Sequence, residues 1–123
     1  MVNITFEQDY IMRLINELIR FLAKVFLNKE IVTYEFSHEE KYTQIDNLHK
    51  QLLILIEQGK INEAENMLYE RMDLKDKKYI ELALDFYERL NNLDDEYLEK
   101  NNFSRKEVEQ GLKGIAKELG VSV

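Results

Sequence analysis

Residues 8–27 read Q-D-Y-I-M-R-L-I-N-E-L-I-R-F-L-A-K-V-F-L, without a proline or a glycine. The apolar residues recur every three or four positions, which is helical spacing, so we predict a helix over about Glu7–Asn28, capped by Thr5. They form two seams, one of Ile11, Leu14, Leu18, Phe21 and Val25, the other of Met12, Ile15, Ile19, Leu22 and Phe26. A helix that covers one core needs a single apolar stripe. The second stripe predicts that the rest of the chain wraps around this helix, or that a second copy helps to cover it.

These two seams leave two interpretations open. If later helices cover only the Met12 seam, the other flank is a candidate interface between two copies, because two-fold oligomers need a self-complementary patch. Its residues are Tyr10, Leu14, Phe21 and Val25. If the helices near the C-terminus fold back, both seams are buried within one chain. The remaining polar strip carries mixed charges, which is typical of a solvated face rather than of a membrane-surface helix.

The composition bounds the class of protein. The chain has 123 residues, of which 45% are hydrophobic, and it has no cysteine and no proline. We expect residues 1–123 to form one helical domain. The absence of cysteine excludes disulfides and thiolate metal sites, and it fits a reducing cytoplasm, where we place the protein.

The charge pattern limits the partners. The net charge of −7 and the interleaving of acids with bases disfavour binding to nucleic acid, which needs a basic surface. Charged side chains interrupt the apolar run of residues 8–27, so we predict neither a signal peptide, nor a membrane span, nor a stable membrane association.

Further helix signals follow along the chain. Ser37–Glu40 is a capping-box sequence that predicts a second helix to about Gln58, ended by Gly59. Asn62–Glu65 predicts a cap for a third helix to about Met72, and the short connection makes these two helices antiparallel neighbours. Three more helices are predicted: one ending near Asn91, a short one from Asp94, and one from the capping box Ser104–Glu107 to Gly120. The predicted fold class is all-α, a bundle of five to six helices.

The segment between the first two helices is different. Val32, Tyr34 and Phe36 alternate with polar residues, as in a strand. A lone strand cannot satisfy its own backbone groups. We therefore interpret residues 29–36 either as an extended strap held by its apolar side chains or as a strand paired with a second copy.

Candidate chemical groups are few. His38 is predicted to be exposed and His49 to lie at the edge of the buried face, and neither has the partners that a metal site or a nucleophile needs. The acids of residues 94–99 are placed where they complement a helix N-terminus. Gly111 and Gly114 resemble the GXXG of a KH loop, but they interrupt a helical pattern, so we assign them to close helix contacts. We predict no catalytic, cofactor-binding or metal-binding residue and no cofactor.

The second and third helices resemble one tetratricopeptide unit over residues 46–72. The matching positions are Leu48, Leu52, Leu55, Gly59, Ala64 and Leu68. Arg71 departs from the small residue expected there, and the terminal proline is missing. The resemblance implies a repeat-like helical hairpin within the bundle rather than an array.

The chain as a whole resembles an uncharacterised family of small helical proteins from low-GC Gram-positive bacteria, a domain of unknown function. The resembling segments are residues 8–13, 55–65 and 82–90. The resemblance implies a stand-alone cytoplasmic protein and supplies no activity or site residue. We therefore predict a non-enzymatic module that binds either a protein partner or a second copy of itself, in which case it forms a homodimer. The alternative is a small-molecule-binding or enzymatic helical protein whose site is not visible in the sequence.

Overall fold

The first helix extends beyond its regular α-helical part. The computed structural model describes residues 6–123. In it α1 spans Phe6–Leu22 and runs directly into a π-helical turn over Ala23–Leu27. The turn ends at Asn28, which adopts the left-handed conformation with φ of 54°. The predicted first helix is thus confirmed, while its predicted cap Thr5 lies outside the described residues.

An extended strap follows α1. Residues 28–39 have no helical structure, and the described part of the chain contains no strand. Val32 and Tyr34 are buried and hold the strap against the bundle, whereas Phe36 is half-buried at its edge, with 37% of its surface exposed. The segment is thus an extended strap held by two of its three apolar side chains, while its pairing with a second copy stays a prediction.

The second helix begins later than predicted. A 3₁₀ turn over Glu40–Tyr42 leads into α2, which spans Thr43–Glu57. Ser37 does not cap this helix, because His38 has a φ of 59°, outside the helical region. The backbone N–H groups of Ser37 and His38 bond to the carboxylate of Asp46 instead, over 3.2 and 3.3 Å. The predicted capping box at this position is therefore wrong.

α2 and α3 form the predicted hairpin. α2 ends at a Schellman turn in which Gly59 has a φ of 77° and the N–H of Lys60 donates to the carbonyl of Leu55 over 2.8 Å. α3 spans Ile61–Arg71 and packs against α2. The predicted cap at Asn62 is wrong, because α3 already begins at Ile61 and the Asn62 amide donates to the carbonyl of Asn102.

α4 is the central helix of the bundle. It spans Lys77–Asn91, and the side chain of Asp76 caps it. It packs against α1, α2 and α6, and Leu82 and Tyr87 have no exposed surface. Of the two alternatives predicted for the first helix, full wrapping by the rest of the chain is wrong, because α1 lies at the edge with α4 and α6 as its main helical neighbours. The other alternative, a second copy that helps to cover it, stays a prediction.

The last two helices begin as predicted. Asp94 caps α5, Asp95–Lys100, by accepting the N–H of Tyr97. α6 spans Arg105–Glu118 and begins with a complete capping box between Ser104 and Glu107. Gly120, with a φ of 86°, ends it.

The glycines inside α6 allow other helices to approach. A Cβ atom on Gly111 would meet the side chains of Glu65 and Tyr87, and one on Gly114 would lie 2.6 Å from the hydroxyl of Tyr69. Both are close-contact positions, as predicted.

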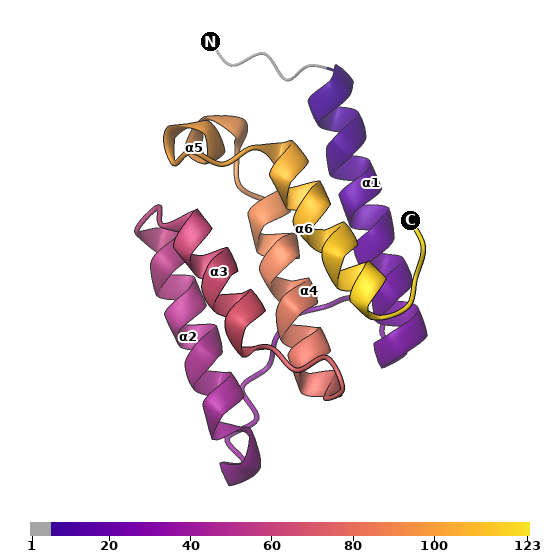
Figure 1. Ribbon diagram of the computed structural model, residues 1–123, viewed down its shortest axis with the longest axis vertical. Helices are drawn as coiled ribbons and strands as arrows, with labels where there is room; N and C mark the ends of the chain where they lie inside the picture. Colours follow the sequence, from indigo (N-terminus) through magenta and orange to yellow (C-terminus); the bar gives the residue numbers. More distant parts are fainter. Residues whose placement is uncertain (1–5) are drawn as a thin grey trace.

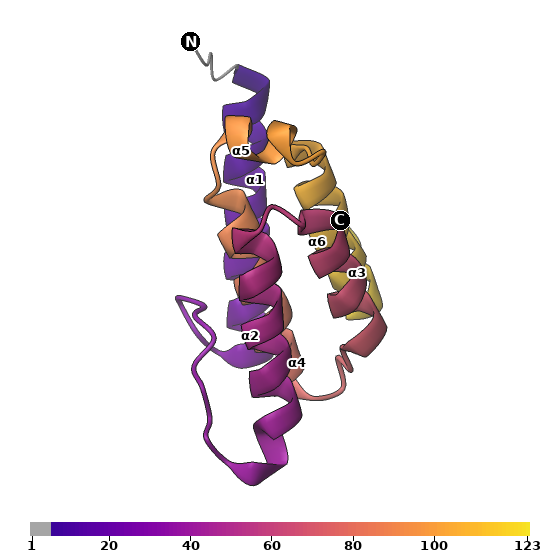
Figure 2. The ribbon, with the colours of Figure 1, turned by 90° about the vertical axis from the view of Figure 1, so that its left-hand side faces the viewer.

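The helices form two layers. α1, α4 and α2 lie side by side in one layer, and α6 and α3 cover it (Figures 1 and 2). α1 and α6 run in the same direction and make one edge of the bundle, while α2 lies at the opposite edge (Figure 1). The strap crosses from the end of α1 to the start of α2 (Figure 2). Each helix from α1 to α6, and the strap, contributes to the apolar core.

Candidate functional site

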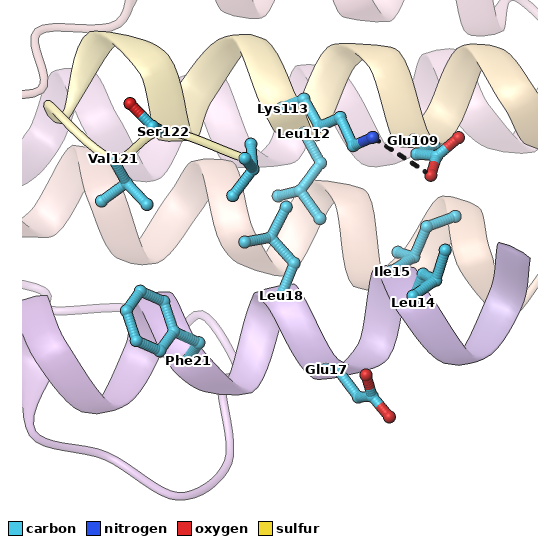
Figure 3. A pocket seen from close by; sticks show the side chains of 11 residues that line it. Leu14, Ile15, Glu17, Leu18, Phe21, Glu109, Leu112, Lys113, Val121 and Ser122 are labelled. Carbon is cyan, nitrogen blue, oxygen red and sulfur yellow. Dashed lines mark ion pairs between the residues drawn. The ribbon is translucent and has the colours of Figure 1, made fainter.

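An apolar groove lies between α1 and α6 at the edge of the bundle. Its volume is about 470 Å³. Leu14, Leu18 and Phe21 line it on the α1 side, and Leu112 forms its floor on the α6 side (Figure 3). The groove is open to solvent rather than enclosed. Exposed side chains of α1 form its outer rim.

The two seams of α1 explain why this groove exists. The second seam faces the core: Ile15, Ile19 and Leu22 are almost completely buried. On the candidate interface flank, Leu14 is only partly buried. Tyr10, Phe21 and Val25 remain 57%, 51% and 56% exposed. One seam is therefore buried within the chain, and the other is covered only along its inner side.

The residues after α6 complete the groove. The N–H groups of Gly120 and Val121 bond back to the carbonyls of Lys117 and Ala116, so the chain turns sharply at the end of the helix. This turn places Val121 over the groove (Figure 3), while Val123 stays 61% exposed. The end of the groove beside Phe21 and Val121 is thus largely apolar as well.

The polar groups around the groove do not form a catalytic arrangement. Lys113 Nζ lies 3.5 Å from Glu109 Oε2 on α6, and Glu17 is an exposed lining residue on the α1 side (Figure 3). The lining contains one hydroxyl, on Ser122, and no histidine that could activate it. The arrangement suits recognition of an apolar surface by shape and burial.

A second group of polar side chains lies beneath the strap. Asp46 of α2 accepts a hydrogen bond from the hydroxyl of Tyr34 over 2.6 Å, in addition to the N–H groups of Ser37 and His38. Burial alone would raise the pKa of Asp46, but these three hydrogen bonds outweigh it, so its pKa lies below the usual value. The carboxylate is therefore charged and holds the strap on α2.

Two acids of α4 hold the other side of the strap. Asp85 accepts the N–H of Tyr34 over 2.9 Å and is paired with Arg89 over 2.7 Å. Glu81 bonds both Lys29 and Lys78, each over 2.7 Å. Burial raises the pKa of Glu81, but the two lysines lower it by a larger amount. The pKa of Glu81 therefore lies below its usual value.

His49 lies at the centre of this group. It is only 2% exposed, so its predicted place at the edge of the buried face is wrong. Its ring stacks on Tyr34 at a centroid distance of 4.4 Å, and its Nδ1 lies 3.9 Å from Asp85. Burial lowers its pKa despite the nearby Asp85 carboxylate. The ring is neutral at pH 7 and covered by the strap, which gives it no access to a substrate.

The other predicted positions have structural roles. His38 is exposed, as predicted. Asp94 caps α5, and Asp95 pairs with Arg105 over 2.6 Å. Arg105 is a buried residue that the sequence analysis missed, because it lies inside a capping-box sequence that usually reaches solvent. It also donates to the backbone carbonyls of Asn91 and Leu93.

Two kinds of feature are absent from the part of the chain that the structure describes. Within residues 6–123 no cluster of three His, Asp or Glu side chains is placed to hold a metal ion. Over the same residues, no helix is both long and apolar enough to cross a membrane.

Comparison with known proteins gives one positive finding. No curated protein and no solved structure matches the chain. A family model matches residues 5–120, and its description assigns no activity. Since this match spans nearly the whole chain, the protein belongs to the Family of unknown function (DUF6483).

Proposed function

We propose that the protein is a non-enzymatic interaction module and that the groove between α1 and α6 is its binding surface. The observation that carries this proposal is the row of large apolar side chains along the exposed flank of α1. Tyr10, Phe21 and Val25 are each more than half exposed, and Leu14 and Leu18 continue them into the groove. Contiguous apolar surface of this kind marks binding sites on soluble proteins.

The shape of the groove favours a helical occupant. Two parallel helices, α1 and α6, form its walls, and their apolar side chains project into it (Figure 3). An amphipathic helix laid between two such walls buries anchors spaced three or four residues apart. Tyr and Phe at the rim add large contact area at a low cost in conformational entropy.

The buried carboxylates beneath the strap support the same proposal, because they hold the fold together and do not line the groove. Asp46, Glu81 and Asp85 each hold the strap through hydrogen bonds that the fold itself needs. The enzymatic alternative would need such groups to converge on an open cavity. The groove has no comparable set.

Three finer expectations accompany this proposal. The hairpin of α2 and α3 resembles a single tetratricopeptide unit, and we propose that it serves as scaffold, because Leu48, Leu52 and Leu68 are buried in the core. We place the protein in the cytoplasm, in a low-GC Gram-positive bacterium. The excess of acids over bases supports a protein partner rather than nucleic acid.

The test compares variants in the groove with a variant on the opposite edge. Leu18→Glu and Phe21→Glu place charge in the groove, whereas Ile54→Glu places it on α2, where Ile54 is 52% exposed. In a quantitative binding assay, we expect wild type and Ile54→Glu to bind the same partner, which is either another protein or a second copy of this chain. We expect the two groove variants to lose this binding. Equal binding by all four chains would contradict the proposal. Saturable binding of a small molecule, lost in Leu18→Glu, would favour the alternative.

A further inference from the structure

The exposed flank of α1 has a symmetric pattern. Tyr10 and Val25 lie equally far from the midpoint between Glu17 and Leu18, and so do Leu14 and Phe21. From this pattern we infer that the occupant of the groove is α1 of a second copy, running antiparallel about a two-fold axis at that midpoint. The inference rests on the proposed function of the groove and names its partner.

The antiparallel arrangement brings the apolar residues together in pairs. Tyr10 of each chain meets the partner's Val25, and Leu14 meets the partner's Phe21. All four contacts form at once, because a two-fold axis repeats each pair. The five flank positions Tyr10, Leu14, Glu17, Phe21 and Val25 are spaced three or four residues apart, so they lie on one face of the helix.

The charges along α1 support the same direction. The first turn of the helix carries Glu7 and Asp9, and its end carries Arg20 and Lys24. An antiparallel pair places the acidic end of each helix beside the basic end of the other. The only ion pair of Lys24 within the described residues is a 3.7 Å contact with the highly exposed Glu30, which solvent screens, so Lys24 is available to the partner.

A parallel arrangement is disfavoured by the same residues. It would place the acids of one chain beside the acids of the other and bring Arg20 and Lys24 next to their own copies. Like charges in contact oppose association. It would also pair each exposed side chain with itself and align the two helix dipoles unfavourably.

The middle of the interface contains an acid that needs a partner. Glu17 is exposed and lies next to the axis, so the two copies of Glu17 would face one another. Arg20 follows one turn later on the neighbouring flank, within reach of the partner's Glu17 in this register. Two reciprocal Glu17–Arg20 pairs then relieve the repulsion, and they make dimerisation sensitive to salt.

The contact offers few large apolar side chains. Stable interfaces bury about 800 Å² per partner. Here each copy contributes three half-exposed apolar side chains, Tyr10, Phe21 and Val25, together with the groove wall. We therefore expect a dimer with a dissociation constant on the order of micromolar, which dissociates on dilution.

The first experiment measures association directly. Light scattering and sedimentation of the full chain over a wide concentration range should show reversible dimerisation. Phe21→Glu should raise the dissociation constant about 100-fold or more, because the two-fold axis repeats the change and each new charge is buried against the partner's Leu14. Ile54→Glu, the matched control on α2, should leave it unchanged. Circular dichroism confirms that each variant remains folded. A wild type that stays monomeric throughout would overturn the inference.

The second experiment tests the direction of the helices. The chain has no cysteine, so single cysteines introduced into it report only the new contacts. A mixture of the Tyr10→Cys chain with the Val25→Cys chain should form a crosslinked dimer under mild oxidation, while each chain alone should crosslink poorly. Efficient crosslinking of either chain with itself would indicate a parallel pair and overturn the register.

The two levels of the proposal fail in different ways. If wild type is monomeric but binds another protein through a contact that Phe21→Glu removes, the second-copy inference is wrong and the proposed function stands. If neither association depends on the groove, both are wrong.

Discussion

Tyr34 and Asp46 are joined by a 2.6 Å hydrogen bond that ties the strap to α2. The same tyrosine donates its backbone N–H to Asp85 of α4. One residue thus fastens an irregular segment to two helices at once. Burial and the Asp46 carboxylate both raise the pKa of the Tyr34 phenol, so its hydroxyl stays protonated and remains the donor.

Removing this hydroxyl should loosen the strap. Tyr34→Phe keeps the ring stacked on His49 but leaves Asp46 with two weaker backbone donors. We expect a loss of about 1–2 kcal/mol in the free energy of unfolding, measured with urea. Tyr42→Phe, which removes a hydroxyl from a half-buried ring at the start of α2, is the control and should change stability little. Equal effects of the two variants would show that the hydrogen bond contributes nothing specific.

Stability should fall in two steps as the pH is lowered. The pKa of His49 lies below its ordinary value of 6.5 in the folded protein, so the unfolded chain takes up a proton first and stability declines as the pH falls below 6.5. Asp46 and Glu81 also have lowered pKa values, from 3.8 and 4.5, and their contribution is lost as the pH falls further through the folded-state values.

Urea titrations from pH 8 to pH 3 measure both steps. His49→Gln should remove the decline that begins near pH 6.5 and leave the more acidic one. Glu65 acts in the opposite sense, because burial raises its pKa. Its contribution to the free energy of unfolding is therefore present at low pH and lost as the pH rises. A wild-type profile that is flat between pH 7 and pH 5 would contradict the assignment of the first step to His49.

Gly59→Val should destabilise the protein through two separate effects. The φ of 77° strains a β-branched residue, and the new Cβ would contact the side chain of Asn101. We expect a loss of about 2 kcal/mol or more. Gly120→Val is the matched control, because Gly120 also has a positive φ, of 86°, but no neighbouring atom. If both variants lose the same stability, the contact with Asn101 has no cost.

Arg105→Ala should be among the most damaging single changes in the chain. It leaves the carboxylate of Asp95 and the carbonyls of Asn91 and Leu93 without their donor in a buried position. We expect a loss of about 3 kcal/mol or more. The neighbouring Lys106 is exposed, so Lys106→Ala serves as control. Arg105→Lys should rescue little, because one ammonium cannot serve three acceptors in the geometry of the guanidinium group.

The sequence predicts features that depend on local chemistry. The spacing of Ile15, Ile19 and Leu22 predicts their burial, and Ser104 with Glu107 predicts a complete capping box, because both signals lie within one helix. Ser37 begins a similar capping-box sequence, but it does not cap a helix. The Asp46 carboxylate, nine residues away in the chain, satisfies the N–H groups that a helix start would leave free.

Features that depend on distant contacts were missed. Glu81 and Asp85 become buried because the strap, about fifty residues earlier in the chain, covers them with backbone donors. The available signal was the run of apolar residues Leu82–Leu84 between two acids, which leaves no solvent-facing side for either acid. The groove itself follows from the position of α6 beside α1, which no local pattern determines.

The attachment of the strap has a consequence for how the protein opens. Its backbone N–H groups at Tyr34, Ser37 and His38 bond to carboxylates of α2 and α4 rather than to other backbone groups. We therefore expect these amides to exchange with solvent deuterium at a rate set by the detachment of the strap, and the amides inside α4 to exchange only when the whole bundle unfolds. In that case the strap opens as a separate unit, and the helices beneath it keep their own backbone hydrogen bonds.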